Sequence, residues 1–480
     1  MTSGLTESLN YSQGVLAMND PLINLVCFEP SGSTLDFSED DLLGHTLAIG
    51  GSGSGKTSRL IHPLISQLIQ VESAKVGMCI LDTKADGTMA AAVRRACFDA
   101  EREEDLVVIN GEGNAHLNIF SGMEDGGLGS IDRMTSLIGS VIPRDERNQY
   151  WENTFEALVR QILRLIHFSK NLNWDYNTLV QQLIRYLLLH QLRDTEYVKE
   201  EDELKARRGN YDPRVQLIID EVVATHRMWD TLDHRTRSIL QSMAATLAGP
   251  MNSGNAFRYF DGNDRIDLSS AVTDQKIILI SIDGIRYPEC ARLLSRFTKG
   301  LFYEAILEQE AHQTGEPIAG LILDDWASCV TAGTGNRYSD IDALAMIRSR
   351  GGFIVAATQS LAALDVVVGK PSRDAALANF ANLVFFRGRD AEVDAIAAAY
   401  LGTKIEVLTD TTIYDGNSST VRRNLPSKFL RQIRTPAVPQ GAIARLATGD
   451  IYAIVGASVY NEAMSLVPLR QARNIPQGSE

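Results

Sequence analysis

The chain has 480 residues, of which 44% are hydrophobic and 22% charged, and its formal net charge is −14. This length and hydrophobic content allow a full buried core and favour two or three domains. The acidic balance excludes a surface that is basic all over, although a nucleic-acid track needs only a local strip of positive potential.

Cysteine spacing and hydropathy favour a cytoplasmic protein. The five cysteines lack C-x-x-C spacing, so reduced, buried thiols are favoured over a zinc site or a disulfide framework. No apolar run reaches membrane-spanning length, and Met1 to Asp20 lacks the charged start and apolar centre of a signal peptide. We expect no intrinsic membrane span, and contact with the inner membrane only through partners.

The first element with recognisable chemistry is a glycine-rich loop between a strand and a helix. An apolar run over Leu47 to Ile49 leads into residues 50–57, GGSGSGKT, which fit the G-x-x-x-x-G-K-[ST] phosphate-binding loop. Glycines are needed because the backbone N–H groups must approach phosphate oxygens closely. In this pattern Lys56 contacts the β and γ phosphates and Thr57 ligates Mg²⁺. The alternative is a flexible Gly/Ser linker that precedes a lysine.

The pattern predicts ATP and Mg²⁺ as cofactors. The residues expected to bind the nucleotide are Gly50, Gly51, Ser52, Gly53, Ser54, Gly55, Lys56, Thr57 and Ser58.

Buried strands alternate with helices in the first 120 residues. We expect a helix from Gly55, kinked at Pro63, and a second helix through Met89 to Arg95. The expected strands are Leu22–Phe28, Leu47–Ile49, Val76–Leu81 and Leu106–Ile109. Such alternation predicts an α/β fold with a mainly parallel sheet.

The pattern then becomes helical. Residues 121–260 carry amphipathic helical patterns and no convincing strand, so we predict an all-α domain inserted into an α/β domain formed by residues 1–120 and 261–480. The expected helices are Trp151–Phe168, Leu179–Leu192, Val215–Met228 and Ile239–Leu247. This insertion is the segment most free to contact partner proteins.

Strands return after the helical segment. They are expected at Lys276–Asp283, Ile318–Leu323, Phe353–Thr358, Asn382–Phe386 and Asp450–Gly456, with helices at Ala291–Gln309, Ile341–Arg350 and Ala391–Tyr400. A phosphate loop, a helical insertion, a strand ending in an acid pair and a strand ending in glutamine, in that order, are typical of a RecA-like P-loop NTPase.

Three strands end in aspartate, and each is a candidate for the magnesium side of the site. Asp82 and Asp283 stand alone, whereas Asp324 and Asp325 form a pair that can hold the Mg²⁺ water shell and activate the attacking water, respectively. We therefore favour Asp324 and Asp325, with Gln359 on the next strand as a γ-phosphate sensor. The alternative for all three strands is a polar turn that meets solvent.

Several arginines are candidates for a finger that reaches a neighbouring subunit's phosphates. Arg348 and Arg350 lie between the acid pair and Gln359, and Arg387 and Arg389 follow the next strand. Each of them, taken alone, is more often a surface residue or part of a structural ion pair. The clearest basic run, residues 422–434, can contact a phosphate backbone or form a solvated loop.

Taken in order, these motifs resemble the type IV secretion coupling proteins, the conjugative DNA-transfer ATPases. The similarity extends from about Asn24 to Pro468. It rests on the phosphate loop followed by Pro63, on Leu81-Asp82-Thr83-Lys84, Tyr150-Trp151, Leu321 to Asp325, Arg350 to Phe353 leading to Thr358-Gln359-Ser360, and Arg387 to Asp390 before Leu401-Gly402. The resemblance implies a ring-forming, usually hexameric ATPase that recruits DNA or protein and threads it toward a secretion channel.

Two departures from the family pattern bear on function. The membrane helices with which family members usually begin have no counterpart in the sequence, and the usual Asp-Glu pair is here Asp324-Asp325, whose second acid is one methylene shorter. A shorter acid can leave the water poorly placed and hydrolysis slow. These departures keep two alternatives open: a soluble nucleotide-switched adaptor that gathers protein partners, and a soluble DNA-acting ATPase of a mobile element or defence system.

Overall fold

A computed structural model describes most of the chain. It covers residues 22–26, 34–71, 76–121, 123, 127–141, 149–168, 231–252, 257–260, 262, 264–332, 339–412 and 427–468, together with scattered positions between 174 and 224. The predicted helices Leu179–Leu192 and Val215–Met228 lie largely outside these residues, as do Cys27, Phe28, Arg422 and Arg423.

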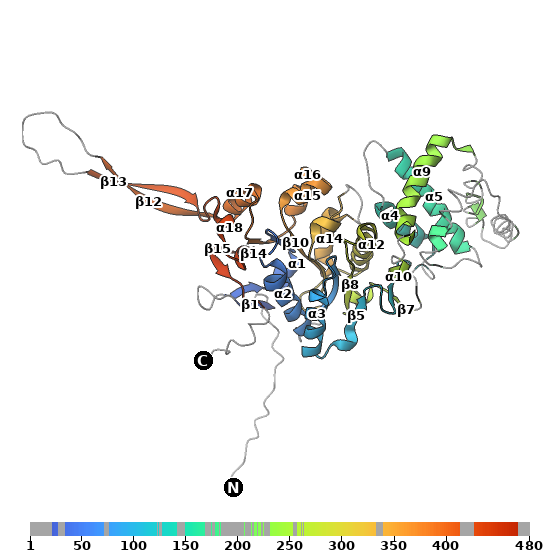
Figure 1. Cartoon of the computed structure of the whole chain (residues 1–480), viewed down its shortest axis with the longest axis horizontal. Helices are drawn as coiled ribbons and strands as arrows, with labels where there is room; N and C mark the ends of the chain where they lie inside the picture. Colours follow the sequence, from blue (N-terminus) through green and yellow to red (C-terminus); the bar gives the residue numbers. More distant parts are fainter. Residues whose placement is uncertain are drawn as a thin grey trace, which may run out of the picture.

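The centre of the fold is a nine-stranded sheet in the order β15-β14-β11-β3-β10-β9-β4-β8-β5 (Figure 1). All neighbours pair in parallel except β11 with β14 and β14 with β15. The strands are β3 (Thr46–Ile49), β4 (Gly77–Asp82), β5 (Leu106–Ile109), β8 (Ile277–Ser281), β9 (Ala319–Leu323), β10 (Gly352–Thr358), β11 (Asn382–Phe386), β14 (Asp450–Val455) and β15 (Ser458–Ser465). The predicted α/β fold with a mainly parallel sheet is confirmed.

The central strands are buried on both faces, because alternate residues point into two hydrophobic clusters. On one face, Ile277 and Leu279 of β8 join a cluster with α1 (Glu39–Leu43), α2 (His62–Gln70), α3 (Thr88–Asp99), β1 (Ile23–Val26) and β2 (Thr34–Phe37). On the other, Ile278 and Ile280 pack in a cluster with α12 (Pro288–Leu307), α13 (Trp326–Cys329), α14 (Asp340–Met346), α15 (Leu361–Val368), α16 (Lys370–Leu377) and α17 (Ala391–Tyr400).

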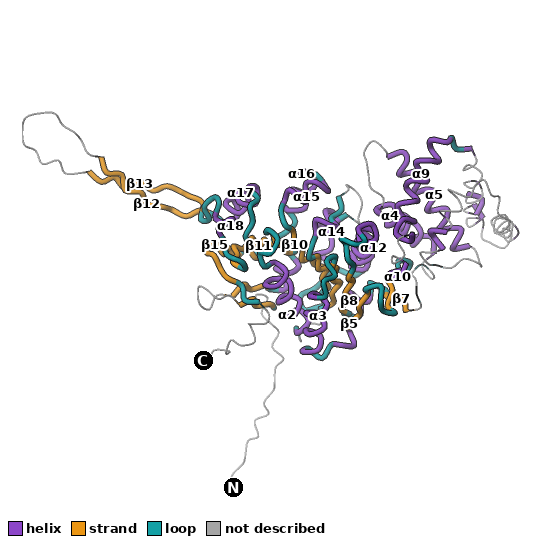
Figure 2. Tube along the Cα trace, in the orientation of Figure 1, coloured by secondary structure: helices purple, strands orange, loops and turns teal. Residues whose placement is uncertain are grey.

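The described residues between 127 and 252 form helices and no strand. The long ones are α4 (Gly127–Val141), α5 (Gln149–Phe168) and α9 (His234–Asn252). Figure 2 shows them beyond the end of the sheet that carries β5. The short parallel pair β6 (Ala115–Leu117) and β7 (Asp264–Ile266) brings the two ends of this segment together, next to α10 (Phe257–Phe260) and α11 (Ser270–Thr273). Its hydrophobic residues continue the cluster that packs against α12, and the domain boundaries stay a prediction.

A two-stranded ribbon projects from the opposite end of the molecule (Figure 1). It consists of β12 (Thr403–Thr412) and β13 (Ser427–Pro436), which pair antiparallel and lead into α18 (Ala442–Arg445). Exposed Ile405 and Val407 alternate with polar residues along β12. The described part of the basic run is therefore a strand, with Arg431 and Arg434 exposed, and not a loop.

Two local predictions differ from the structure. The helix after the phosphate loop begins as a π-helical turn, η1 (Lys56–Ile61), and becomes α-helical only at His62, because Pro63 has no N–H to continue an α-helical ladder through its own position. The helix predicted over Ile341–Arg350 ends at Met346 and continues as the 3₁₀ turn η5 (Ile347–Arg350) before Gly351, whose φ of 77° suits glycine. A further short 3₁₀ turn, η2 (Glu103–Asp105), precedes β5.

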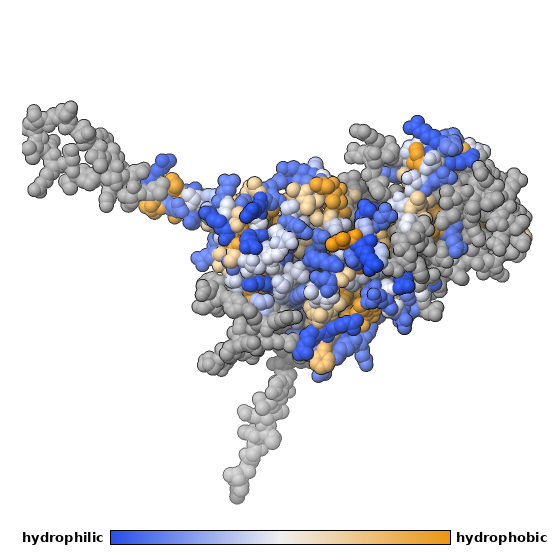
Figure 3. Space-filling model, in the orientation of Figure 1, coloured by the Kyte–Doolittle hydropathy of each residue, from blue (hydrophilic) through white to orange (hydrophobic). Residues whose placement is uncertain are grey.

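Among the described helices, none is long and apolar enough to cross a bilayer. The surface drawn in Figure 3 is mainly hydrophilic, with hydrophobic residues in small, separate groups.

Candidate active site

The phosphate loop lies at the carboxyl edge of the sheet, where parallel α/β folds bind ligands. The Gly50 N–H donates to the carbonyl oxygen of Thr358 at 3.2 Å, and the Gly51 N–H donates to that of Arg387 at 2.8 Å. The loop is thus held between the ends of β10 and β11. A Cβ atom on Gly50 would lie 2.5 Å from the Phe386 Cβ, and Gly55 has a φ of 107°, so both positions require glycine.

Lys56 is folded into this loop. Its ammonium donates to the carbonyl oxygens of Gly50 and Gly51, and the residue is 8% exposed. Burial, followed by the nearby Lys84 charge, lowers the pKa of Lys56, Asp324 and Asp325 raise it, and the net result is a pKa of about 8. The ammonium lies at the base of the loop that would receive phosphate groups.

Thr57 and Asp324 converge on a cation. The Thr57 hydroxyl donates to the Asp324 carboxylate at 2.6 Å. The ammonium of Lys84 contacts the other oxygen of that carboxylate and lies 3.3 Å from the Thr57 hydroxyl. The Lys84 ammonium thus places a positive charge between a hydroxyl and a buried carboxylate. Hydroxyl and carboxylate oxygens are ligands that Mg²⁺ prefers, so Thr57 and Asp324 fit a magnesium ion.

The structure separates the three candidate acids. Asp82 is buried, and its two oxygens accept hydrogen bonds from the N–H groups of Lys84 and Ala85 and from the Ser281 hydroxyl. Asp283 accepts from the N–H groups of the turn that follows it and lines a different cleft. Only Asp324 contacts Thr57, because β9 is separated from β3 by β10 alone. The geometry thus favours the predicted pair.

Asp325 faces the same cavity as Lys56. Burial and the adjacent Asp324 raise its pKa, and the charges of Lys84 and Lys56 lower it less. Its carboxylate makes no hydrogen bond or ion pair with the residues that the structure describes. A carboxylate with a raised pKa and free oxygens is suited to accept a proton from water.

These groups line one cavity of about 1210 Å³, large enough for a nucleotide. Besides the loop, its walls include Asp324, Asp325 and Gln359, which the sequence predicts. They also include Lys84, His62 and Arg95, which no sequence motif marks as functional. The buried His62 Nε2 has no partner among the described residues, and burial lowers the His62 pKa. In the sequence, Lys84 stands out only as the last residue of Leu81-Asp82-Thr83-Lys84, one of the segments that carry the family resemblance.

The candidate arginines fall at opposite edges of the sheet. Arg387 follows β11 beside the phosphate loop, and its carbonyl oxygen accepts from Gly51. Arg348 and Arg350 precede β10, whose seven residues place them roughly 20 Å from the loop. Arg348 pairs with Asp40 at 2.7 Å, and the Arg350 guanidinium donates to a backbone carbonyl. The two groups of arginines cannot act on the same bound nucleotide within one chain.

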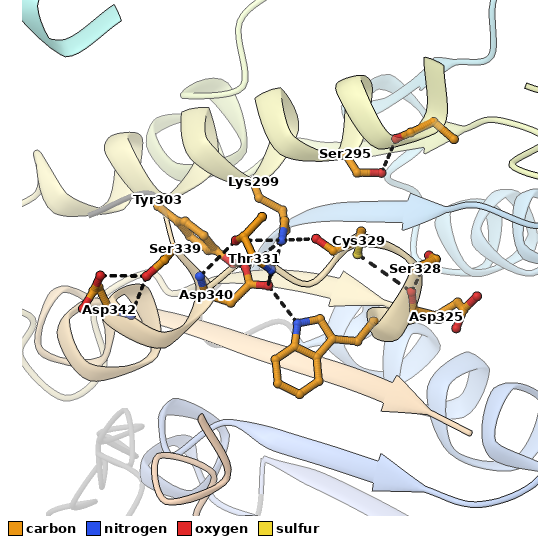
Figure 4. Close-up of polar contacts among 12 residues, drawn as sticks. Ser295, Lys299, Tyr303, Asp325, Ser328, Cys329, Thr331, Ser339, Asp340 and Asp342 are labelled. Carbon is orange, nitrogen blue, oxygen red and sulfur yellow. Dashed lines mark hydrogen bonds and ion pairs between the residues drawn. The ribbon is translucent and has the colours of Figure 1, made fainter. Parts of the chain in front are cut away.

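A buried ion pair supports the turn that carries Asp325 (Figure 4). Lys299 on α12 lies 2.7 Å from the Asp340 carboxylate on α14, and each side chain is 1% exposed. Asp340 also accepts from the Trp326 indole at 2.9 Å and the Tyr303 hydroxyl at 2.5 Å. The Lys299 ammonium donates in addition to the carbonyl oxygen of Cys329, the last residue of α13. The single turn after Asp325 is therefore tied to α12 and α14.

Replacing Lys299 by methionine should destabilise the protein strongly. The change leaves the Asp340 carboxylate buried without its cation, which typically costs about 3–5 kcal/mol. Urea unfolding followed by tryptophan fluorescence should show a lower midpoint. Arg160→Met is the control, because Arg160 pairs with Asp132 at 2.9 Å with both side chains about a third or more exposed, and such pairs contribute about 1 kcal/mol or less. Equal midpoints for the two variants would contradict a structural role for the buried pair.

Comparison with known proteins gives matches of three kinds. The family model described as "TraM recognition site of TraD and TraG" matches residues 337–448. The Type 4 coupling protein DotL of Legionella pneumophila is 26% identical over 151 residues, which are 29% of this chain and 19% of DotL. The chain thus matches about a fifth of the length of that curated relative.

The solved structures that resemble this fold include two forms of one protein. The bacterial conjugative coupling protein TrwBdeltaN70 superposes with a TM-score of 0.58 at 16% identity, covering 93% of this chain and 88% of that one. TrwB in complex with ADP and Mg²⁺ superposes with a TM-score of 0.57 at 16% identity, covering 90% and 86%. VirB4 of Thermoanaerobacter pseudethanolicus gives a TM-score of 0.50 at 12% identity, covering 93% and 96%.

Proposed function

We propose that the chain is a Mg-ATP-dependent ATPase that works as a ring-forming motor on DNA or protein. The proposal starts from the RecA-like P-loop fold and from the resemblance to the type IV secretion coupling proteins, which these comparisons confirm. One observation supports this most: Lys56, Thr57, Asp324 and Asp325 meet in a single cavity around the phosphate loop. TrwB, which shares the fold, binds ADP with Mg²⁺.

Each residue has a distinct task in this proposal. The loop N–H groups and Lys56 bind the β and γ phosphates, and Thr57 with Asp324 would hold Mg²⁺, which neutralises phosphate charge. Lys84, which contacts Thr57 and Asp324 in the structure, would have to leave this position for them to hold the metal. Asp325 takes the proton of the attacking water, and Gln359, exposed at the end of β10, reads the γ-phosphate.

The arginines support action at subunit interfaces. Arg350 lies too far from its own phosphate loop to reach a nucleotide bound there, but its exposure leaves it accessible to a neighbouring subunit. Arg387, beside its own loop, is exposed as well. We propose that one of them stabilises γ-phosphate charge across an interface in a homo-oligomer, a hexamer as the family implies. Partner proteins of a secretion system would contact the helical segment 121–260 or the matched region 337–448.

The proposal is tested by ATP turnover and solution mass. ATP turnover by the purified chain should require Mg²⁺ and should rise when single- or double-stranded DNA is added. Light scattering should show that the active species has the mass of a ring of several chains. A monomer that binds ATP, turns over slowly and ignores DNA would replace the motor by a nucleotide-switched adaptor.

Nucleotide affinity should fall at alkaline pH. Lys56 has a pKa lowered to about 8, so the free protein loses this charge as pH rises through that value, and the proton must be regained on binding. The dissociation constant for a fluorescent ATP analogue should therefore increase by up to tenfold per pH unit above about 8. The Lys56→Arg variant keeps its charge over this range, so its nucleotide affinity should not change with pH. If the affinity of this variant fell with the same midpoint, the effect would belong to another group.

A further inference from the structure

A second cleft opens at the same edge of the sheet, beyond the ends of β5 and β8. It has a volume of about 330 Å³, and three arginines from three different segments line it. Arg94 comes from α3, Arg258 from α10 and Arg286 from the loop between β8 and α12. The proposed ATPase chemistry uses none of these residues. We call this site the arginine cleft.

The three guanidinium groups have no ion-pair partner among the residues that the structure describes. The chain carries 60 acidic and 46 basic residues, and two other arginines around the sheet are paired with acids. Arg102 and Arg373 lie 3.0 Å and 2.7 Å from carboxylates. Three unneutralised arginines that converge on one cleft repel one another, so the cleft is suited to an anion that neutralises them.

Two acids also line the cleft and limit what enters it. Glu112 and Asp283 are part of its wall, but neither lies within ion-pair distance of the arginines. One Asp283 oxygen accepts from the N–H groups of Ile285 and Arg286 at 3.0 and 2.9 Å, which shapes the loop that presents the third guanidinium. The cleft keeps a positive balance of one charge.

The cleft offers a flat surface beside its charges. The Arg286 guanidinium lies over the Tyr287 ring at 5.3 Å from the ring centroid, and the neighbouring Ile285 is 94% exposed. Guanidinium planes and aromatic rings stack on unpaired bases, whereas arginine forks bind phosphates. The volume of about 330 Å³ suits one nucleotide unit. Stacking on the Arg286–Tyr287 pair requires an unpaired base, so the chemistry matches a single strand.

Helix α3 forms a wall between this cleft and the nucleotide cavity. Thr88, Ala91 and Arg95 line the nucleotide cavity, whereas Ala90 and Arg94 line the arginine cleft. The two sites are also connected by a backbone hydrogen bond of 3.0 Å from Gly284, in the Arg286 loop, to Thr83, next to Lys84. Lys84, which contacts Asp324, is therefore next in the chain to a residue that is bonded to the loop of the arginine cleft.

We propose that the arginine cleft binds the phosphodiester backbone of a single-stranded nucleic acid, with the flat Arg286–Tyr287 pair against its bases. The proposal rests on the motor function above and assigns it a polymer contact. It differs from contact through the basic ribbon β12–β13, where Arg431 and Arg434 are exposed.

The test is oligonucleotide binding by the full chain. Fluorescence anisotropy with labelled oligo(dT) should give a dissociation constant at least tenfold higher for the triple variant Arg94→Gln, Arg258→Gln, Arg286→Gln. The slope of log affinity against log salt should fall in magnitude by about 2, since each single-strand phosphate contact contributes about 0.7. Affinity for a fluorescent ATP analogue should stay unchanged, which shows that the variant is folded.

Two controls separate this proposal from its alternatives. The triple variant Arg133→Gln, Arg160→Gln, Arg164→Gln removes the same charge from arginines already paired with acids and should bind oligo(dT) like the original chain. If oligo(dT) affinity falls instead in the triple variant of the paired arginines, or in the double variant Arg431→Gln, Arg434→Gln, the proposal for the arginine cleft is overturned. It is also overturned if the original chain does not bind oligo(dT). Absence of ATP binding by the original chain would refute the ATPase proposal and leave the oligonucleotide result to be judged alone.

Discussion

The Lys56→Ala variant is expected to lose ATP turnover and to bind nucleotide at least tenfold more weakly. The Lys56 ammonium is buried in the phosphate loop against two carbonyl oxygens, so alanine removes the one positive charge inside the loop and leaves those carbonyls facing the phosphates. A charge-assisted contact of this kind contributes about 1.5–3 kcal/mol to binding, and its loss in the transition state adds to that. Phosphate release and titration with a fluorescent ATP analogue measure the two effects.

A charge-matched control keeps this prediction specific. Lys276 lies near the amino end of β8, paired with Asp105 at 3.3 Å, far from the phosphate loop. Lys276→Ala makes the same change in net charge and should leave turnover and affinity within about twofold, as surface substitutions usually do. Turnover that survives in Lys56→Ala would show that the catalytic site lies elsewhere in the chain.

The second large effect is expected at Asp325. Asp325→Asn removes the only proposed proton acceptor for water, and loss of a general base typically lowers turnover by about 10²–10⁴-fold. Nucleotide affinity should persist, because Thr57, Asp324 and Lys56 are unchanged. Asp325→Glu restores the longer acid of the family pattern and should raise turnover if reach limits the reaction.

The pH profile identifies the same group. Because burial and Asp324 raise the Asp325 pKa, the base is lost by protonation at a higher pH than an exposed aspartate would require. The acid limb of kcat should accordingly lie above the usual aspartate range and move in Asp325→Glu.

Asp283→Asn is the control for this assignment. Asp283 also follows a strand at this edge of the sheet but lines the arginine cleft, so turnover without DNA should be nearly unchanged. Loss of turnover in Asp283→Asn together with its survival in Asp325→Asn would reverse the choice of acids.

The sequence by itself determined the fold class and the phosphate loop. Residues 50–57 are recognisable because the loop works through contiguous backbone N–H groups, and the apolar strands are recognisable because both faces of a parallel sheet are buried. The position of the break near Pro63 was also predictable, whereas the π-helical form of η1 is seen only in the structure. Local pattern is enough for each of these features.

Only the tertiary structure decided which distant residues meet. The choice between Asp82, Asp283 and Asp324 depends on strand order, since the sequence places all three at strand ends and only the order β3-β10-β9-β4 brings Asp324 to Thr57. Likewise, Lys84 between Thr57 and Asp324, and the three arginines of the second cleft, come from segments far apart in the chain. Their convergence follows from strand pairing and helix packing, which no local pattern encodes.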